Sequence, residues 1–143
     1  MKKLGEIMNR EVHSIHPGIS VKEAANLMRS LDLSVLPVCR DGEILGMLTD
    51  RDMTVHIAAV ARDPATTFVK DIMNPHPAIL WEQDPIQAAE RIMEDRGTHW
   101  VFVVDADRTL VGILSLGRIA RGDTEKAAGK VVNGISRRRE RVG

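Results

Sequence analysis

The stretch Leu4-Gly-Glu-Ile-Met-Asn9 decides how this chain folds, because it returns as Val69-Lys-Asp-Ile-Met-Asn74. A second stretch, Gly46-Met-Leu-Thr49, returns as Gly112-Ile-Leu-Ser115. The first pair is offset by 65 residues and the second by 66, so the two copies drift by one residue only. Two copies of this length are too few and too long for a solenoid array. The sequence therefore predicts two small, related lobes.

The composition limits the size and the partners of the fold. The chain has 143 residues, 43% of them hydrophobic and 28% charged, and its formal net charge is zero. A chain of this length hardly has the apolar surface for two independent cores, so one compact domain with a single core is predicted. Zero net charge argues against a general attraction to nucleic acid or to membrane surfaces.

The sequence predicts a cytoplasmic protein. Cys39 is the single cysteine, which excludes an intramolecular disulfide and favours a reducing compartment. No apolar run approaches the roughly 18 residues that a membrane span needs, and the first residues do not resemble a signal peptide.

Both copies carry a start signal for a first helix. In the first copy, Ser20-Val-Lys-Glu23 is typical of a capping box, so a helix is expected from Val21. Its expected buried stripe consists of Val21, Ala24, Ala25 and Met28. In the second copy, Asp84-Pro-Ile-Gln87 predicts Asp84 as the cap and proline as the first helical residue.

A hairpin is expected after each of these helices. The runs Val35–Cys39 and Ile44–Leu48 are separated by Arg40-Asp-Gly-Glu43, whose Asp-Gly pair is typical of a tight turn. The second copy offers Val101–Val104 and Leu110–Leu114. Each copy thus contributes two antiparallel strands.

The remaining segments complete the order β-α-β-β-α in each copy. Short extended pieces, Val12–Ile15 and Ala78–Leu80, precede the first helices. Second helices are expected to begin at about Asp50 and about Leu116. The sequence therefore predicts a mixed α/β (α+β) fold built from two β-α-β-β-α repeats.

This order, with the motifs in it, resembles the tandem CBS domain, a module named after cystathionine β-synthase. The resemblance covers about residues 4–122 and rests on Ile-Met-Asn at 7–9 and 72–74, Leu36-Pro-Val38 and Gly46-Met-Leu-Thr-Asp-Arg-Asp52. It implies repeats at 1–66 and 67–122, packed sheet to sheet about a pseudo-twofold axis. Residues 123–143 lie beyond the repeats and form a basic tail. The resemblance also implies clefts for adenosine-containing ligands and a homodimer.

The sharpest functional feature is Thr49-Asp-Arg-Asp52, at a strand end where a helix begins. The backbone N–H groups of a helix start attract phosphate, and Thr49 adds a hydroxyl. The carboxylate of Asp52 can accept both hydroxyls of a ribose, which is the role that the resemblance implies for it. The competing interpretation is a simple capping box, in which the acid bonds back to its own helix start.

The resemblance implies that residues of the other repeat complete this site, from 98–100 and from 73–77. A His-Arg pair is common in related modules at the positions of His99 and Trp100. Loss of that arginine weakens the case for a triphosphate, whereas Trp100 could stack on a purine or fill a lobe interface. An adenine slot is expected between Leu36, Pro37 and Val101. The predicted nucleotide-binding residues are Thr49, Arg51, Asp52, Met73, Pro77, His99, Trp100 and Val101.

The second copy departs from the pattern, because Arg118 stands where Asp52 stands in the first. Arginine has no acceptor for a ribose hydroxyl, so one adenosine site of the usual kind is predicted instead of two. Arg118 could fill the second cleft, reach phosphate in the first, or lie on the surface at a helix end. The residues predicted for this secondary cleft are Ser115, Arg118, Ser34 and Val35.

The sequence offers no catalytic or metal-binding machinery. It has no nucleophile with a base beside it and no paired-carboxylate cleft, so no enzymatic activity is expected. Its histidines lack the spacing of metal ligands, so no metal site is expected. The segment 137–141 is basic, but it lacks interleaved aromatic residues, so nucleic-acid binding is not favoured.

The sequence favours a stand-alone regulatory protein that binds an adenosyl ligand and relays its presence to a protein target. The expected ligand is AMP, ADP or ATP, with S-adenosylmethionine or NAD as further possibilities, and no other cofactor is required. Met53–Val60 is apolar over much of its circumference, so it could form the homodimer face or pack on its own repeat. Two alternatives are a ligand-free dimeric interaction scaffold and a nucleic-acid-associated factor acting through 123–143.

Overall fold

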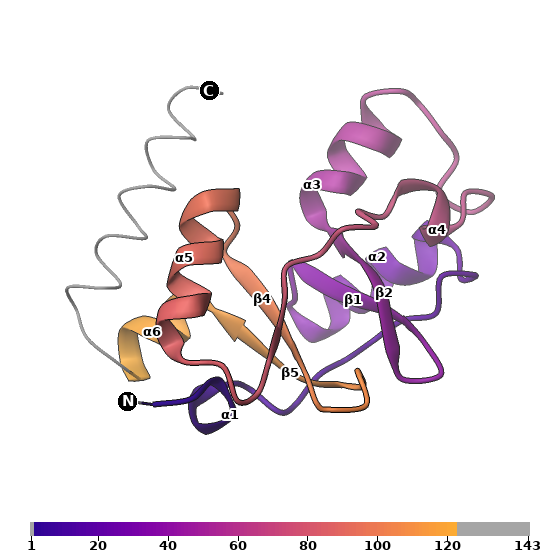
Figure 1. The fold of residues 1–143 in the computed structure, drawn as a ribbon. Helices are drawn as coiled ribbons and strands as arrows, with labels where there is room; N and C mark the ends of the chain where they lie inside the picture. The colour runs from indigo at the N-terminus through magenta and orange to yellow at the C-terminus, as the bar shows by residue number, and fades with distance from the viewer. Residues whose placement is uncertain (1, 123–143) are drawn as a thin grey trace. The chain divides into compact units, whose positions relative to one another are not determined.

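The computed structural model describes residues 2–122, shown in Figure 1. The elements in chain order are α1 (Leu4–Ile7), α2 (Val21–Leu31), β1 (Val35–Arg40), β2 (Glu43–Thr49), α3 (Asp50–Met53), η1 (Thr54–Ala58), α4 (Val69–Ile72), β3 (Ile79–Trp81), α5 (Ile86–Arg96), β4 (Trp100–Val104), β5 (Leu110–Ser115) and α6 (Leu116–Gly122). The predicted mixed α/β fold with two repeats is confirmed. The predicted basic tail lies outside the described residues.

The chain forms two compact units that exchange their opening helices. Unit 2 comprises residues 13–77, and unit 1 comprises the described residues 2–12 and 78–122. Unit 1 therefore takes α1 from the first repeat, where it contacts β5 and α6 of the second (Figure 1). Unit 2 in turn takes α4 from the start of the second repeat. The exchange gives each unit a short helix from the other copy.

The helices α1 and α4 explain part of the repeated sequence, although the sequence did not predict them as helices. Each is four residues long and carries an acid at its third position. Glu6 accepts a hydrogen bond from the Lys3 backbone N–H at 3.1 Å, and Asp71 accepts one from the Phe68 N–H at 3.3 Å. The recurring acid therefore pairs with a backbone donor just before the helix.

The asparagine that ends each repeated stretch joins a strand. Asn9 exchanges two backbone hydrogen bonds with Ile113, at 2.9 and 3.0 Å, and Asn74 exchanges two with Met47, both at 2.9 Å. Each asparagine side chain also accepts from the backbone N–H two residues further on. This turn redirects the chain immediately after the paired residue.

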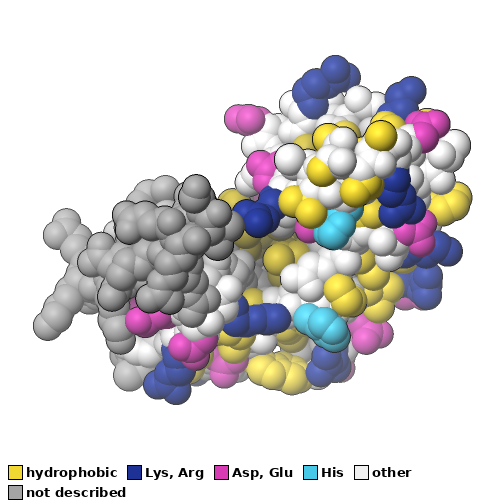
Figure 2. Space-filling view, turned by 90° about the horizontal axis from the view of Figure 1, so that it is seen from above, with side chains coloured by type: hydrophobic (Ala, Val, Ile, Leu, Met, Phe, Trp, Pro, Cys, Tyr) yellow, Lys and Arg dark blue, Asp and Glu magenta, His cyan; other side chains and the backbone are white. Residues whose placement is uncertain are grey.

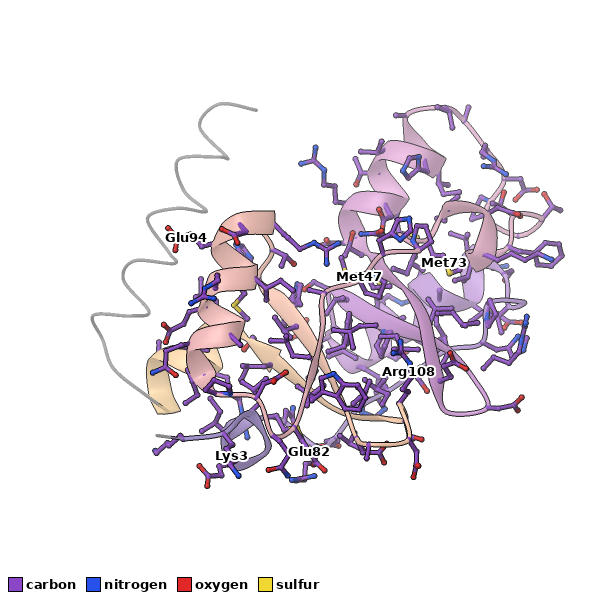
Figure 3. The ribbon with its side chains drawn as sticks, viewed as in Figure 1. Lys3, Met47, Met73, Glu82, Glu94 and Arg108 are labelled. Atoms are coloured by element: carbon purple, nitrogen blue, oxygen red, sulfur yellow. The ribbon has the colours of Figure 1, made fainter. Side chains whose placement is uncertain are left out.

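The repeated glycines, Gly46 and Gly112, lie where these asparagine segments cross the strands. A Cβ atom at Gly46 would lie 2.6 Å from the Asn74 carbonyl oxygen and 2.9 Å from the Met73 sulfur. A Cβ atom at Gly112 would overlap the Met8 sulfur. Figure 3 labels Met47 and Met73 at the first crossing. Both glycines are therefore required by close packing.

The sheet of unit 2 is the predicted hairpin. β1 and β2 pair antiparallel, and their turn places Asp41 and Gly42 at φ values of 52° and 83°, as a type I′ turn requires. The extended piece at 12–15 forms no strand of its own. It contributes one parallel bridge, between Ile15 and Val38.

The helix α2 begins at Val21, as predicted, because the Ser20 hydroxyl accepts from the Glu23 backbone N–H at 3.1 Å. Val21, Ala24 and Met28 are buried. The inclusion of Ala25 in this stripe was wrong, since Ala25 is exposed. The buried stripe of α2 is narrower than the apolar pattern suggested.

The sheet of unit 1 has the order β3-β4-β5, with β3 parallel to β4 and β4 antiparallel to β5. The predicted cap of α5 was wrong by one residue: the helix begins at Ile86 and Pro85 is its N-cap. The Asp84 carboxylate instead accepts from the Trp81 backbone N–H at 2.8 Å. Asp84 therefore stabilises the turn between β3 and α5.

Most of the buried residues fall into two clusters, one in each unit, and the single core stays a prediction. The cluster of unit 1 is Leu4, Ile7, Met8, Ala78, Ile86, Ala89, Met93, Val101, Val103, Leu114 and Ile119. The cluster of unit 2 is Ile15, Val21, Ala24, Met28, Leu36, Val38, Leu48, Ile57, Val69 and Ile72. Each cluster includes residues of the exchanged helix, so the exchange supplies apolar surface that each repeat alone lacks.

Candidate ligand-binding site

The predicted site begins where β2 of unit 2 runs directly into α3. Thr49 is both the last residue of β2 and the N-cap of α3. The Asp50 backbone N–H donates to the Ser34 carbonyl at 3.1 Å, and Val35 pairs with Thr49 across the hairpin. The helix start is therefore fixed to the residues that open β1.

A complete capping box holds Asp52. Its Oδ2 accepts from the Thr49 backbone N–H at 2.8 Å and from the Thr49 hydroxyl at 3.0 Å. The same hydroxyl accepts from the Asp52 backbone N–H at 3.2 Å. The competing interpretation of this motif, a capping box, therefore describes the geometry in the absence of a ligand. Both side-chain bonds go to one oxygen of the half-buried carboxylate.

The helix after this junction widens into a π-helical turn. Arg51 is exposed in the first turn, and α3 continues into η1 at Thr54. Ile57 is buried in the cluster of unit 2, whereas Val55 of the same helix is 43% exposed. Val60, in the turn that follows η1, is 59% exposed. This segment therefore packs on its own unit through Ile57 and presents two apolar side chains to solvent.

Two further predicted residues belong to unit 2. Met73 follows α4, is half-buried, and packs against the core of that unit. Pro77 is half-buried at the last position of the unit. Unit 2 thus contains two residues predicted for the secondary cleft, Ser34 and Val35, and five predicted for the nucleotide site: Thr49, Arg51, Asp52, Met73 and Pro77.

Unit 1 repeats the junction with other residues. Ser115 ends β5 and pairs with Trp100, and α6 begins at Leu116. The Leu116 backbone N–H donates to the His99 carbonyl at 3.0 Å. His99 and Trp100 therefore hold the places that Ser34 and Val35 hold in unit 2. Val101, the next residue along β4, is fully buried.

Arg118 does not lie free on the surface. Its backbone N–H donates to the Ser115 hydroxyl at 3.1 Å, which repeats half of the capping box of unit 2. Its side chain is half-buried, and its Nε donates to the Ile7 carbonyl oxygen at 2.8 Å. The interpretation of Arg118 as an ordinary surface residue at a helix end is therefore wrong.

The predicted nucleotide-binding set draws on both units. Thr49, Arg51, Asp52, Met73 and Pro77 belong to unit 2, whereas His99, Trp100 and Val101 belong to unit 1. Two walls expected for the adenine slot, Leu36 and Val101, are fully buried in the clusters of their own units. The joint use of both groups by one ligand stays a prediction.

One acceptor at these junctions was missed by sequence reasoning. The Ile7 carbonyl is a backbone group, and its residue type carries no signal for a polar role. Only the repetition of Ile-Met-Asn at positions 7–9 and 72–74 marked the place. The carbonyls of the last helical turn lack partners within a helix, which is why this one can bind Arg118.

Three further features of the described residues concern metal binding, membrane spans and thiol chemistry. Over residues 2–122 there is no cluster of three or more His, Cys, Asp or Glu side chains suited to a metal ion. In the same stretch no helix combines the length and apolar character of a membrane span. Burial raises the pKa of the Cys39 thiol, and a hydrogen bond with Ser14 opposes that effect. Cys39 therefore favours the unreactive thiol form.

The fold and the doubled strand-to-helix junction define a tandem CBS pair. The protein-family model of the CBS domain matches residues 4–59 and again 69–124. The chain belongs to the CBS domain family.

Two curated relatives match almost end to end. The CBS domain-containing protein YhcV of Bacillus subtilis is 29% identical over 137 residues, which cover 95% of this chain and 96% of YhcV. Hypoxic response protein 1 of Mycobacterium tuberculosis is 33% identical over 131 residues, which cover 91% of each chain. Each of these matches thus covers at least nine-tenths of both chains.

Solved structures extend the comparison. A crystal structure of Hypoxic Response Protein I with two coordinated zinc ions has a TM-score of 0.78 at 30% identity, covering 86% of this chain and all of that one. CBSX2, a CBS-pair protein of Arabidopsis thaliana, in complex with AMP has a TM-score of 0.74 at 26% identity, covering 85% and 95%. A chain of similar fold thus binds an adenine nucleotide.

Proposed function

We propose that this chain is a regulatory CBS-pair protein that binds an adenosine-containing ligand at the junction of β2 and α3. The observation that carries the proposal is the Thr49–Asp52 arrangement, a half-buried carboxylate held at a strand-to-helix turn. The AMP complex of CBSX2 supplies the ligand class. We further propose that ligand binding is relayed to a protein target, in the cytoplasm and without catalysis.

The chemistry of the junction suits a nucleoside. The bonds from Thr49 fix Oδ2 of Asp52, and this orients the carboxylate before any ligand arrives. Its Oδ1 is then the acceptor for a ribose hydroxyl, in a charge-assisted hydrogen bond. The exposed guanidinium of Arg51 is the cation in the same turn that suits a phosphate.

AMP is the ligand we favour. ADP and ATP follow, and S-adenosylmethionine and NAD share the adenosine group. Trp100 stands where related modules often carry an arginine, so less positive charge is available for additional phosphates. We retain His99 as a contributor to phosphate binding and Trp100 as a contributor to purine stacking, each to be tested by substitution.

We also propose a homodimer that uses the helix formed by α3 and η1. Val55 in η1 and Val60 in the turn after it are among the exposed large hydrophobic side chains, and η1 also buries Ile57 in unit 2. Figure 2 shows one face of the molecule on which hydrophobic side chains are exposed in groups between charged ones. Burial of such groups against a second copy would remove apolar surface from water.

A second candidate function is a ligand-free interaction scaffold. The specific observation in its favour is the complete capping box, which bonds one oxygen of the Asp52 carboxylate within its own helix start. The two candidates make different predictions for titration with nucleotides. A scaffold binds none of them, whereas a sensor binds at least one.

The test is isothermal titration of the full chain with AMP, ADP, ATP, S-adenosylmethionine and NAD, together with two variants at position 52. Asp52→Ala removes the acceptor, and Asp52→Asn keeps an acceptor for Thr49 while removing the charge. We expect about one AMP per chain for the unaltered protein and at least a tenfold loss of affinity in both variants.

Glu43→Ala is the matched control, because it removes an exposed carboxylate from the far end of the same hairpin. It should bind AMP as the unaltered protein does. A folded Asp52→Asn variant with full affinity would refute the site. Absence of heat with all five ligands would favour the scaffold.

A further inference from the structure

We propose that His16 makes the attachment of α4 to unit 2 sensitive to pH, because its neutral imidazole closes the turn to which α4 is bonded. This inference goes beyond the proposed function and does not depend on nucleotide binding. Three observations carry it: one acceptor nitrogen, the backbone hydrogen bonds that join the turn to α4, and the places of the charged groups nearby.

The turn at 16–19 is closed by a ring nitrogen. The Gly18 backbone N–H donates to Nδ1 of His16 at 2.9 Å, and the Ile19 N–H donates to the His16 carbonyl at 3.3 Å. A Cβ atom at Gly18 would lie 3.0 Å from the same Nδ1, so the ring lies directly against the glycine. Although His16 is exposed, its imidazole is therefore a structural part of the turn.

The bond from Gly18 requires a ring whose Nδ1 carries no proton. A backbone N–H is always a donor, so its partner nitrogen must be an acceptor. The imidazolium form carries a proton on each nitrogen and accepts no hydrogen bond. Protonation of His16 therefore breaks this bond and adds a positive charge to the turn. Imidazole is the side chain that ordinarily changes its charge between about pH 5 and pH 8.

Two asparagines of the chain make the same kind of turn with an amide oxygen. Asn9 accepts from the Glu11 N–H at 3.0 Å, and Asn74 accepts from the His76 N–H at 2.9 Å. In each case, as at His16, the acceptor side chain lies two residues before the donor. An amide oxygen accepts over the whole physiological pH range. The turn at 16–19 thus uses a titratable acceptor where an amide would serve.

The same turn holds the start of α4. The Val69 N–H donates to the Ile19 carbonyl at 3.0 Å, and the Lys70 N–H donates to the Pro17 carbonyl at 3.0 Å. Both N–H groups lie in the first turn of α4, where no acceptor is available within the helix. Val69 is also fully buried in the cluster of unit 2. Opening of the turn therefore loosens the hold of unit 2 on a helix that comes from the second repeat.

The charged groups nearby are bonded elsewhere or lie apart from the ring. On α4, the Lys70 ammonium lies 5.7 Å from the centroid of the Phe68 ring, and the Asp71 carboxylate accepts from the Phe68 N–H at 3.3 Å. Within residues 2–122, no salt bridge engages His16. The titratable side chains on the segments around the turn are His13 on its own segment, Lys22 and Glu23 of α2, Cys39 and Arg40 of β1, Arg62 and Asp63 before α4, and Lys70 and Asp71 of α4.

The direction of the pH effect follows from these contacts. The folded turn favours the neutral ring, because only that form accepts from Gly18. No carboxylate among the described residues forms an ion pair with His16 that would favour the charged ring instead. The attachment of α4 is therefore strongest with neutral His16 and weakens as the pH falls through the range in which imidazoles gain a proton.

The experiment measures amide hydrogen exchange of the full chain by NMR spectroscopy, at about pH 7.5 and about pH 5.5. Protection factors remove the pH dependence of the exchange chemistry itself. We expect protection at Gly18, Val69 and Lys70 to fall about three- to tenfold at the lower pH, the loss of one hydrogen bond. Protection in β4 of unit 1 should stay constant and serves as the internal reference.

Three variants assign the effect to one ring. His16→Asn supplies an acceptor that does not titrate in this range, so protection at Val69 and Lys70 should stay high at both pH values. His16→Ala supplies no acceptor, so protection should be low at both. His56→Asn is the matched control, because it replaces an exposed histidine of η1 and should keep the pH response of the unaltered chain.

Each outcome decides the inference. Equal protection at the two pH values in the unaltered chain overturns it. So does a full pH response in folded His16→Asn, because another group would then be responsible. If His16→Asn does not fold, His16→Ala decides, and a pH response retained in that variant overturns the inference as well. None of these measurements uses a nucleotide, so failure of the proposed function would leave the result intact.

Discussion

Unit 1 and unit 2 share a strand-to-helix junction but place opposite charges in it. In unit 2 the junction carries Asp52, whose carboxylate caps its own helix start. In unit 1 it carries Arg118, whose guanidinium binds the end of α1. The two copies therefore share a backbone frame and differ in the side chain at one position. In the function we propose, recognition resides in that side chain, and the frame alone does not specify a ligand.

The exchange of α1 and α4 between the repeats can be tested by measuring how a core substitution in α1 affects each unit. Leu4→Ala should destabilise the protein by about 2–5 kcal/mol, because Leu4 is fully buried in the cluster of unit 1. Although Leu4 lies in the first repeat, amide chemical-shift changes should concentrate at 78–120 and spare 13–77. Leu27→Ala, at an exposed leucine of α2, should cost under about 0.5 kcal/mol. Shift changes spread evenly over both units would contradict the exchange.

The two glycine crossings should differ in their tolerance of a methyl group. Gly46→Ala should cost about 1–3 kcal/mol in urea unfolding, since the new Cβ would meet the Asn74 backbone oxygen. Gly112→Ala should cost less, because its obstacle is the flexible Met8 side chain. Equal losses of unfolding free energy in the two variants would contradict the expected difference between the crossings.

Loss of the capping hydrogen bonds should lower the free energy of unfolding by less than the core and glycine substitutions do, as measured without nucleotide. Asp52→Ala should lower the free energy of unfolding by about 0.5–2 kcal/mol, because two hydrogen bonds to Thr49 are lost. Asp52→Asn should retain most of this stability while losing AMP affinity. Thermal unfolding of both variants without nucleotide tests this, and equal destabilisation by both would assign the role of Asp52 to its charge.

The last and smallest expected effect is the slow chemical modification of the Cys39 thiol in the folded chain. Burial raises the pKa of its thiol, so little thiolate forms near neutral pH in the folded state. Alkylation by iodoacetamide should therefore be slow in buffer and faster in urea, where the thiol returns to its ordinary pKa. Rapid modification of the folded chain, followed by mass spectrometry, would show that β1 of unit 2 opens readily.

Much of the fold could be predicted because the signals are local. Ser20 as a cap and the Asp-Gly turn at 41–42 each act within a few residues, and both were confirmed. The N-cap of α5 was predicted one residue too early, because the Asp84 carboxylate accepts a hydrogen bond from the Trp81 backbone N–H instead. Two adjacent partners for one carboxylate cannot be ranked from sequence alone.

The exchange of α1 and α4 could not be predicted, because it depends on contacts between distant segments. The repeated sequence stretches pointed to Asn9 and Asn74, but nothing in these stretches indicates which strand each asparagine joins. The same limit applies to Arg118, whose partner is a backbone carbonyl 111 residues away. Side-chain chemistry excluded an acceptor role for Arg118, and only the structure supplied the contact.

The most direct test of the account is a crystal structure of the full chain grown with saturating AMP. We expect one AMP per chain, with its ribose hydroxyls on the Asp52 carboxylate and the bond from Arg118 to Ile7 intact. AMP bound at Arg118 would contradict it. So would AMP elsewhere on the chain, with Asp52 bonded only to Thr49.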